Sequence, residues 1–399
     1  MKLLHITSLY PSQCAPRSGQ AVRKLIDSLK RLPNREISNL TFHCIPLSFF
    51  PVNLFDSEWR CLEKLRKAPS ENAVRIISSI VLPRSKGRKF CAKNKAKRIH
   101  KEVKNNNFTP DIVHCHTAFS DGYSGYLLNK KYDIPYVLTV RREIDFQNND
   151  LNYEEERFTV ENILASSVII APSVHLKNKC LQHTGREAIL VPNGIESKLI
   201  VSEEELSRKQ NERETKLTIV TIASLDKNKR IDIVMSCFSK LLKKCFFLAH
   251  LDIVGTGPLE EDLRELARIE GITSNVTFHG DVSRQIVMQI LDEGDIFFLP
   301  SETETFGLVY LEALARGLPI IGRKNQGIDG LAKHGIHGFF ENDIEAFYVD
   351  LETLSKDRDL RNHMSKNGVE LAKNCTWEKS GRKLLELYRG IVFCTKNQR

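Results

Sequence analysis

The 399-residue sequence lacks several patterns that would each indicate a particular class of protein. No CxxC pair occurs among its ten cysteines, so zinc-ribbon and disulfide-scaffold folds have no support. No apolar run approaches the roughly 18 residues that a membrane-spanning helix requires. The first residues, MKLLHITSLYP, contain too short an apolar stretch for a signal peptide and are typical of a strand. We therefore expect a soluble, cytoplasmic protein with reduced thiols, bound at most to the surface of a membrane.

Internal repeats of solenoid period and low-complexity tracts are also absent. A chain of this length is too long for one ordinary core, so we expect two domains of similar size. Strand-like runs alternate with helix-like segments in both halves, a rhythm typical of doubly wound parallel sheets in an α/β fold. These runs are residues 2–7, 111–114, 136–140, 168–171 and 188–191, then 217–223, 250–254, 276–279, 296–299 and 319–321.

A charged segment separates the two halves. Residues 195–216 include SEEELSRKQNERE, which predicts a solvated helix or linker, and the VPNG turn at 191–194 suits a hinge. Residues 1–200 contain 31 Lys and Arg against 19 Asp and Glu, a balance of +12, whereas the remainder contains 28 against 31, a balance of −3. The first half is therefore basic and the second nearly neutral.

The basic charge is concentrated in residues 84–104, which contain ten Lys or Arg and one acid. Ala92, Ala96, Ile99 and Val103 recur there at helical spacing, so the segment predicts a basic amphipathic helix. Such a face can bind anionic lipid or nucleic acid. An ordinary solvated helix is the alternative interpretation.

Two carboxylates bracket an apolar run in SETETFGLVYLEALARGLP, residues 301–319. The pattern predicts a helix that begins near Thr305 or Phe306 and ends before Gly317. Glu304 would then lie at the start of the helix and Glu312 two turns inside it, beside apolar residues. Because an unpaired carboxylate is costly in such surroundings, Glu312 needs a partner. Arg316, one turn further on, could supply one as an ordinary exposed ion pair.

Other motifs follow predicted strands, where ligands bind in open parallel sheets and helix N-termini attract anions. Gly19 precedes a predicted helix at 21–30, and its missing side chain would let a phosphate approach the backbone. A turn-forming glycine without a ligand is the alternative. The three cations of DKNKR at 226–230 could neutralise a diphosphate or form a solvated cluster. GTGP at 255–258 is weak evidence, because it lacks the third glycine of the dinucleotide-binding pattern.

Two patterns that resemble metal sites are interpreted otherwise. His114 and His116 flank Cys115, but alternation along a strand turns the histidines and the cysteine to opposite faces, and the sequence around them offers no third ligand. Asp357-Arg358-Asp359 lies in a polar helical tract far from the other motifs and is attributed to chance. The sequence therefore predicts no metal site.

Together these motifs resemble the family 4 glycosyltransferases, retaining enzymes of the two-domain GT-B architecture, over most of the chain. Glu304 and Glu312, framing seven residues that include Phe306-Gly307-Leu308, look like the family's pair of spaced glutamates. The other matches, in the family's order, are the Gly19 loop, residues 111–116, 191–194, 254–258, 276–280 and 317–319.

The resemblance implies two Rossmann-like domains that face a central cleft. Residues 1–195 would bind the acceptor, 196–216 would form the linker, and 217–375 would bind the nucleotide sugar. Residues 376–399 would form a last helix that crosses back onto the first domain.

The resemblance also implies roles for individual residues. Glu312 would accept hydrogen bonds from the ribose hydroxyls of the donor, and Glu304 would hold hydroxyls of its sugar. The backbone N–H groups of Phe306, Gly307 and Leu308 would face the diphosphate or the sugar, and the Gly19 loop would also approach the donor. Lys229 matches the phosphate-binding lysine and would offset charge on the leaving diphosphate. Lys229 and Glu304 are thus the predicted catalytic residues, and neither a cofactor nor a metal is required.

The sequence departs from the family at two positions. Ser224 stands where the family usually has an arginine that helps the lysine, and Lys227, Asn228, Arg230 or Arg17 could compensate. Arg141 stands where the family commonly has histidine. An arginine is always charged and cannot act as a base at neutral pH, so Arg141 is expected to bind phosphate or an anionic acceptor. Arg17 and His116 are the other candidate acceptor or phosphate contacts.

The implied reaction moves a hexose from a nucleotide diphosphate sugar, with UDP as the expected nucleotide, to an acceptor hydroxyl with retention of anomeric configuration. The acceptor would be a lipid-linked saccharide of cell-surface polysaccharide or lipopolysaccharide synthesis, met at an anionic membrane surface, and no nucleic acid partner is expected. A nucleotide-sugar epimerase of the same architecture and a non-catalytic partner protein are the alternatives.

Overall fold

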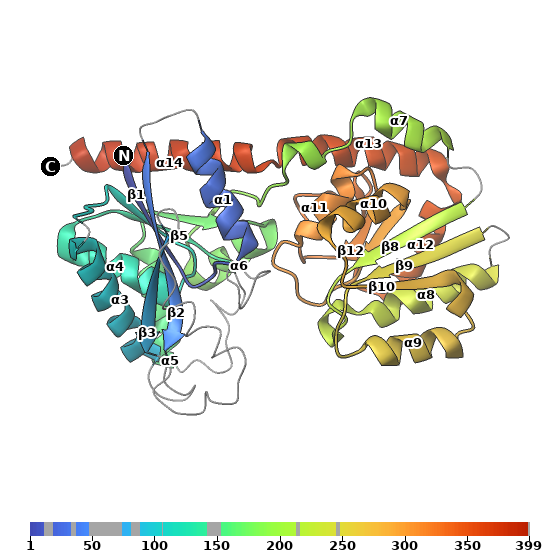
Figure 1. Ribbon diagram of the computed structural model, residues 1–399, viewed down its shortest axis with the longest axis horizontal. Helices are drawn as coiled ribbons and strands as arrows, with labels where there is room; N and C mark the ends of the chain where they lie inside the picture. Colours follow the sequence, from blue (N-terminus) through green and yellow to red (C-terminus); the bar gives the residue numbers. More distant parts are fainter. Residues whose placement is uncertain are drawn as a thin grey trace. The chain divides into compact units, whose positions relative to one another are not determined.

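The computed structural model describes residues 1–11, 19–32, 37–47, 74–80, 88–105, 107–141, 153–212, 216–244 and 248–397 of the chain. They form two compact α/β units, each built on its own sheet (Figure 1). Unit 1 comprises Met1–Pro172, Leu176–Pro192 and Trp377–Arg399, and unit 2 comprises Ser173–His175 and Asn193–Thr376. No described helix is both long and apolar enough to cross a membrane.

Unit 1 contains a seven-stranded parallel sheet with the strand order β3-β2-β1-β4-β5-β6-β7. Its strands are β1 (Lys2–Thr7), β2 (Ser38–Leu47), β3 (Val74–Ile80), β4 (Ile112–Cys115), β5 (Tyr136–Thr139), β6 (Val168–Ala171) and β7 (Ile189–Leu190). The helices around it are α1 (Gln20–Arg31), α3 (Arg88–Asn105), α4 (Ser120–Tyr132), α5 (Tyr153–Leu164), α6 (Val174–Thr184) and α14 (Trp377–Asn397).

Unit 2 contains a six-stranded parallel sheet with the order β10-β9-β8-β11-β12-β13. Its strands are β8 (Lys216–Ile222), β9 (Leu248–Val254), β10 (Val276–Gly280), β11 (Ile296–Leu299), β12 (Ile320–Arg323) and β13 (Gly338–Glu341). Its helices are α7 (Glu203–Glu212), α8 (Ile231–Lys244), α9 (Glu260–Ile269), α10 (Arg284–Glu293), α11 (Leu308–Ala315), α12 (Ile344–Lys356) and α13 (Arg358–Asn374). The prediction of two doubly wound parallel sheets is confirmed.

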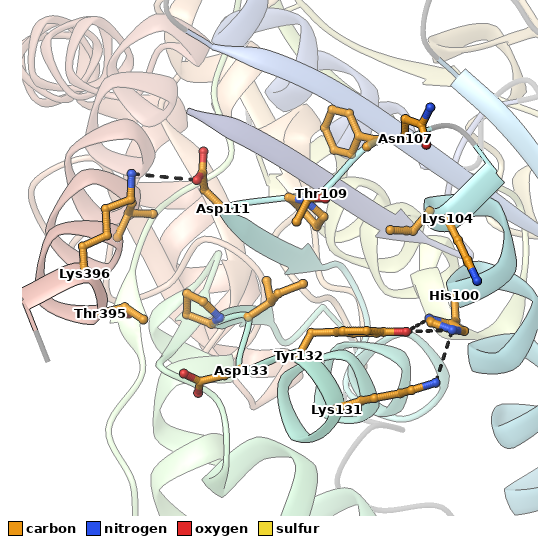
Figure 2. Close-up of a pocket in the computed structure, with 16 residues that line it drawn as sticks. His100, Lys104, Asn107, Thr109, Asp111, Lys131, Tyr132, Asp133, Thr395 and Lys396 are labelled. Carbon is orange, nitrogen blue, oxygen red and sulfur yellow. Dashed lines mark hydrogen bonds and ion pairs between the residues drawn. The ribbon is translucent and has the colours of Figure 1, made fainter. Parts of the chain in front are cut away.

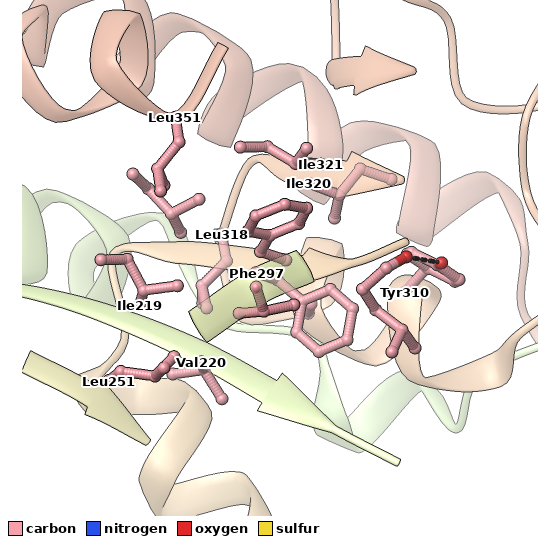
Figure 3. Packing of buried hydrophobic residues seen from close by; sticks show 14 of the residues in the cluster. Ile219, Val220, Leu251, Phe297, Tyr310, Leu318, Ile320, Ile321 and Leu351 are labelled. Atoms are coloured by element: carbon pink, nitrogen blue, oxygen red, sulfur yellow. Dashed lines mark hydrogen bonds between the residues drawn. The ribbon is translucent and has the colours of Figure 1, made fainter. Parts of the chain in front are cut away.

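The core of unit 2 fixes the position of α11 against the middle of the sheet (Figure 3). All four residues of β11 are buried, as a parallel strand covered on both faces requires. The ring of Tyr310, on α11, meets Phe297 edge-on at 5.4 Å, and its hydroxyl donates to the carbonyl oxygen of Leu299. Burial raises the pKa of Tyr310 well above its usual value, so the phenol stays a hydrogen-bond donor. These contacts hold the first turn of α11 beside the carboxyl end of β11.

The structure differs from the expected linker at residues 196–216. Helix α7 belongs to unit 2, and its Leu206 is buried in a small cluster with Val201 and Val369. The Lys209 ammonium donates to the carbonyl oxygens of Leu291 and Arg316, at 2.9 and 2.8 Å. The segment is therefore packed, because one apolar side and one lysine of an otherwise charged helix supply enough contacts.

The last helix, α14, begins at Trp377, where the chain enters unit 1 again. Leu384 and Tyr388 are fully buried there, and Gly381 lies so close to α1 that a Cβ would stand 2.6 Å from the Ser28 hydroxyl. That the two units face a common cleft remains a prediction from the resemblance.

Candidate functional site

Three loops at one edge of the unit 2 sheet carry most of the predicted donor-binding residues. They follow β8 (residues 223–230), β9 (255–258) and β11 (300–307). The carboxyl ends of parallel strands meet at the same edge, and β8 lies between β9 and β11 in the sheet. This order brings Lys229 to Glu304 across 75 residues of sequence.

Lys229 and Glu304 form an ion pair at this edge. Lys229 Nζ lies 2.7 Å from Glu304 Oε2, and the two side chains are 18% and 17% exposed. The backbone of Glu304 is held on both sides, because its N–H donates to Gln326 Oε1 and its carbonyl oxygen accepts from the N–H of Gly327. The two predicted catalytic residues therefore occupy one place in the structure, where a cation and a carboxylate both remain within reach of solvent.

Asn228 joins the two loops that carry this pair. Its carbonyl oxygen accepts from the N–H of Glu302 at 2.8 Å, and its side-chain amide donates to the carbonyl oxygen of Thr303 and accepts from the Thr303 N–H, each at 2.9 Å. The turn before it is capped by Asp226, whose carboxylate accepts from the Asn228 N–H. Because this amide is engaged by the loop, Asn228 positions Lys229 and does not replace the family arginine.

Helix α11 begins at Leu308, two to three residues later than predicted. Gly307 precedes it in the left-handed conformation, with φ +70°, and a Cβ there would lie 2.4 Å from the Tyr310 ring. The turn thus needs glycine, and the tightness of this turn delays the helix. Phe306 is buried in the core, so its side chain supports the loop and only its backbone could reach a ligand.

Glu312 lies on α11 and is 12% exposed. Its partner is Arg284 at the start of α10, with Arg284 Nη2 2.7 Å from Glu312 Oε1. The expected alternative partner, Arg316, instead contacts Asp292 and the carbonyl oxygen of Leu199, because it closes the helix and its side chain extends toward α10. The sequence reasoning missed Arg284, which precedes Glu312 by 28 residues and belongs to no motif.

Of the cations near Lys229 in the sequence, one is paired with carboxylates and one is exposed. Arg230 contacts Asp232 at 2.9 Å and Glu302 at 2.8 Å, and hydrogen bonds to these carboxylates raise its pKa further above the usual value. Ser224 donates to Asp226 at 2.6 Å. Lys227 is exposed and makes no ion pair within the described part of the chain. Arg17 lies outside the described residues, and among the described cations Lys227 is the remaining candidate to assist Lys229.

The glycines of GTGP serve close packing between loops. Gly255 has φ +128°, and a Cβ there would lie 1.8 Å from the carbonyl oxygen of Ala223. A Cβ at Gly257 would lie 2.3 Å from the carbonyl oxygen of Leu225, whose N–H donates to Thr256. The loops after β8 and β9 are thus fastened together, which accounts for both glycines without a ligand.

Gly19, His116 and Arg141 lie at the carboxyl edge of the unit 1 sheet, after β1, β4 and β5. Gly19 precedes α1 with φ +69°, and a Cβ there would lie 2.4 Å from the backbone of Leu9. This close approach accounts for the glycine by packing. His116 and Arg141 are both buried.

No third histidine lies near His114 and His116 along the sequence, but the fold brings one to them. The register of β1 on β4 places His5 opposite His114, and the three buried rings offer nitrogens within 4.8 Å of one another. His5 Nδ1 contacts His116 Nε2 at 3.1 Å, whereas His114 contacts the hydroxyls of Tyr388 and Thr139 at 2.5 and 2.7 Å. Four of the six ring nitrogens thus have partners, whereas the buried His5 Nε2 and His116 Nδ1 have none within the described part of the chain.

Burial controls the charge of this cluster. It lowers the pKa of His5 to about 3, and burial together with neighbouring rings and Arg141 holds the pKa values of His114 and His116 well below their usual range. Burial also lowers the pKa of Arg141 to about 10, so the guanidinium stays charged at neutral pH. A metal cation would have to lie near this positive charge, which makes the three neutral rings a poor metal site.

Lys95 does not belong to the exposed basic face on which the sequence placed it. It is buried and forms an ion pair with the fully buried Asp121, and its ammonium also donates to the Ser8 hydroxyl at 2.8 Å. Burial alone would lower the pKa of Lys95, but the Asp121 carboxylate raises it above its usual value. Among the α3 side chains that the structure describes, the exposed cations are Lys93, Lys97, Arg98, Lys101 and Lys104.

Comparisons with known proteins agree with this geometry. The family model described as "Glycosyl transferases group 1" matches residues 202–371, and "Glycosyltransferase Family 4" matches residues 52–199. Sucrose-phosphate synthase from Thermosynechococcus elongatus has a similar structure, with a TM-score of 0.72 and 16% identity over 98% of this chain and 99% of that one. Anabaena HepE in complex with UDP gives a TM-score of 0.71 and 17% identity, over 98% of this chain and 99% of that one.

The sequence relatives match a smaller share of this chain than the solved structures do. Alpha-monoglucosyldiacylglycerol synthase from Acholeplasma laidlawii is 27% identical over 303 residues, 71% of this chain and 76% of that protein. Sulfoquinovosyl transferase from Arabidopsis thaliana is 25% identical over 295 residues, and the match spans 69% of this chain and only 56% of that longer protein. The fold and the two family models thus define a glycosyltransferase of the GT-B class. Within that class, the chain belongs to glycosyltransferase family 4, in the group 1 type.

Proposed function

We propose that the protein transfers a hexose from a nucleotide diphosphate sugar to an acceptor hydroxyl with retention of configuration. The observation that carries this proposal is the contact of Lys229 with Glu304 beside the α11 turn, with Glu312 on the same helix. UDP is the proposed nucleotide, and the similarity to HepE, whose structure was determined with UDP, supports that choice.

Each site residue has a definite part in this reaction. When the donor binds, the Lys229 ammonium would leave Glu304 for the diphosphate, and the Glu304 carboxylate would accept hydrogen bonds from hydroxyls of the sugar. Glu312 uses one oxygen for Arg284, so its second oxygen can accept from the ribose hydroxyls. As the bond between sugar and phosphate breaks, negative charge grows on the diphosphate, where a fixed cation stabilises the transition state most.

The positive charge that the reaction needs comes from side chains in this proposal. Asn228 fastens the turn that carries Lys229 to the loop of Thr303, and the exposed Lys227 precedes Lys229 by two residues in the same turn. We therefore propose a reaction that needs no metal ion and no cofactor. The leaving diphosphate would take the proton of the acceptor hydroxyl on the face from which it departs.

The proposed acceptor is a lipid-linked saccharide of cell-surface polysaccharide or lipopolysaccharide synthesis, bound by unit 1. The name of the Acholeplasma relative, a glycolipid synthase, supports a lipid acceptor. Arg141 keeps its charge at neutral pH, which suits an acceptor with a phosphate, and His116 lies at the same edge of the sheet. A cytoplasmic enzyme working at the inner face of a membrane would meet such a substrate.

The proposal is tested by assaying uridine, guanosine and adenosine diphosphate sugars with lipid-linked acceptors in the presence of a metal chelator. One donor class should raise the unfolding temperature by a few degrees, since a ligand at 100 times its dissociation constant adds about 2.7 kcal/mol of stability. With the acceptor, nuclear magnetic resonance should show a product with the donor's anomeric configuration. An isomerised free sugar formed without acceptor would establish the epimerase instead, and no nucleotide binding at all would favour a non-catalytic partner.

We also propose that α3 holds the enzyme on an anionic membrane. Its exposed cations Lys93, Lys97 and Lys101 lie four residues apart, on one face of the helix. Each basic residue near an anionic surface contributes about 1 kcal/mol. Replacing these three lysines by glutamine should weaken binding to anionic vesicles about 100-fold in a flotation assay.

The matched control for the membrane prediction changes Lys324, Lys333 and Lys366, three exposed lysines of unit 2, to glutamine. It removes the same charge and should leave flotation within about twofold of the wild type. Equal weakening by the two triple variants would mean that net charge alone attracts the protein, and unchanged flotation of the α3 variant would rule out this helix as the contact.

A further inference from the structure

A pocket of about 670 Å³ lies in unit 1 at the amino-terminal edge of its sheet (Figure 2). Its walls are the last turns of α3, α4 and α14 and the turns that lead into β4 and β5. Gly19, His116 and Arg141 lie at the opposite edge of the same sheet, and Lys229 and Glu304 lie in unit 2. None of the residues that line the pocket is among those assigned above to donor or acceptor.

One corner of the pocket is cationic. Lys104 and Lys131 lie there on either side of His100, and the Tyr132 hydroxyl contacts the His100 ring at 2.5 Å (Figure 2). Lys131 Nζ lies 3.3 Å from His100 Nε2, so this ammonium is aimed at a ring nitrogen and not at a carboxylate. In the described ranges neither Lys104 nor Lys131 forms an ion pair. Burial, and then the charges of Lys131 and Lys104, lower the pKa of His100, as a corner of positive potential requires.

The other end of the pocket is neutralised. Lys396 Nζ lies 3.9 Å from Asp111 Oδ1, and the second Asp111 oxygen accepts from the backbone N–H of Lys2 at 2.7 Å (Figure 2). The pocket also has apolar lining residues, here called the apolar wall, which are Val103, Phe108, Pro110, Ile134, Pro135 and Val392. The carboxylate of Asp133 also lines the pocket and lies away from the cationic corner (Figure 2). The pocket thus combines two lysines that form no ion pair in the described ranges with an apolar wall, within the usual size range of small-molecule sites.

We propose that this pocket binds an amphipathic phosphomonoester, with the phosphate between Lys104 and Lys131 and the organic part along the apolar wall. A phosphomonoester carries nearly two negative charges and several acceptor oxygens, which match two ammonium groups and the Tyr132 hydroxyl. A single carboxylate would leave one lysine without a counter-charge. The ester could be a soluble metabolite or the headgroup of a phosphatidic acid lipid.

Helix geometry offers a simpler reason for the two lysines. Both lie in the last turns of their helices, where cations complement the helix dipole. This role accounts for lysines at these positions but not for the apolar wall or for a hydroxyl and a ring nitrogen at the same corner. A test must therefore separate ligand binding from the stability of the helix ends.

The experiment is calorimetric titration of the full chain with inorganic phosphate, glycerol 3-phosphate and monomeric dihexanoyl phosphatidic acid. The variant Lys104→Gln/Lys131→Gln should weaken binding of both esters at least about tenfold, because each loses a charged partner. The matched control Lys130→Gln/Lys383→Gln removes two exposed lysines that lie outside the pocket, on α4 and α14, two of the helices that border it, and it should bind within about twofold of the wild type. Hydrogen exchange of the wild type should show slower exchange at 107–111 and 132–135 when an ester is bound.

The outcomes show whether the ester is a lipid or a soluble metabolite, and they also show whether the proposal is wrong. Tighter binding of the lipid than of glycerol 3-phosphate assigns the site to a membrane lipid, and equal binding of the two esters, tighter than inorganic phosphate, assigns it to a soluble metabolite. The proposal is overturned if inorganic phosphate binds as tightly as both esters, if no ester binds at millimolar concentration, or if both double variants lose equal affinity. Because UDP binding by unit 2 is measured on the same samples, this result stands apart from that of the transferase assay.

Discussion

Replacing Lys229 by methionine is expected to lower kcat for sugar transfer about 10²- to 10³-fold, the usual cost of losing one preorganised group that stabilises transition-state charge. Lys229 Nζ lies against Glu304 Oε2, and in our proposal it moves to the diphosphate when the donor binds. Methionine keeps the length of the side chain without its charge. The measurement is steady-state kinetics with the donor identified by the thermal-shift screen.

Two further variants make this result specific. Lys244→Met removes an exposed cation from the end of α8 in the same unit and should leave kcat within about twofold. Lys227→Met shows whether this exposed lysine replaces the family arginine, in which case kcat falls by a smaller factor than for Lys229→Met. If Lys229→Met retains more than about a tenth of the wild-type kcat while its fold is intact, Lys229 does not stabilise the leaving group.

Replacing Lys95 by methionine is expected to destabilise unit 1 by about 3 kcal/mol, at the lower end of the cost of breaking a buried ion pair. Asp121 is fully buried and would lose its counter-charge. The loss is limited because the backbone N–H and the hydroxyl of Ser8 still donate to the Asp121 carboxylate, at 3.0 and 2.8 Å. Hydrogen exchange of the β4 amides measures the stability of this unit without assuming that the whole chain unfolds in one step.

The control for Lys95 is Lys97→Met, which changes an exposed lysine two residues further along α3 and should alter stability by less than about 0.5 kcal/mol. The double variant Lys95→Met/Asp121→Leu removes both buried charges and should recover most of the lost stability. An unchanged exchange rate in Lys95→Met would show that Asp121 is satisfied without the lysine, and failure of the double variant to recover would point to packing as the cause.

The strand pattern of the fold was largely readable from the sequence. The apolar runs at 2–7 and 296–299 coincide with β1 and β11, because a parallel strand buried on both faces is apolar throughout. Strands β2, β3 and β13 were not predicted. Strand β2 mixes polar residues and Pro46 with its apolar ones, and β13, with the sequence GFFE, contains only two apolar residues, so neither has a clear period.

The site was readable in part. The spacing of Glu304 and Glu312 and the position of Lys229 came from the resemblance to the family, and the structure adds the contact between Lys229 and Glu304. No local signal marked Arg284 as the partner of Glu312, since a long-range ion pair leaves no periodic trace in the sequence. Lys95 was assigned to the exposed face for the same reason, because a lysine in a basic stretch gives no sign that a distant aspartate is buried beside it.

The sequence by itself determined the α/β class and the existence of two sheets, because these follow from local periodicity, and its loop motifs carried the resemblance to the family. Only the tertiary structure decided which loops meet. Strand β11 pairs with β8, which sets Lys229 beside Glu304, and β1 pairs with β4, which sets His5 beside His114. The order of strands in a sheet depends on the packing of the whole unit, so no short stretch of sequence contains it.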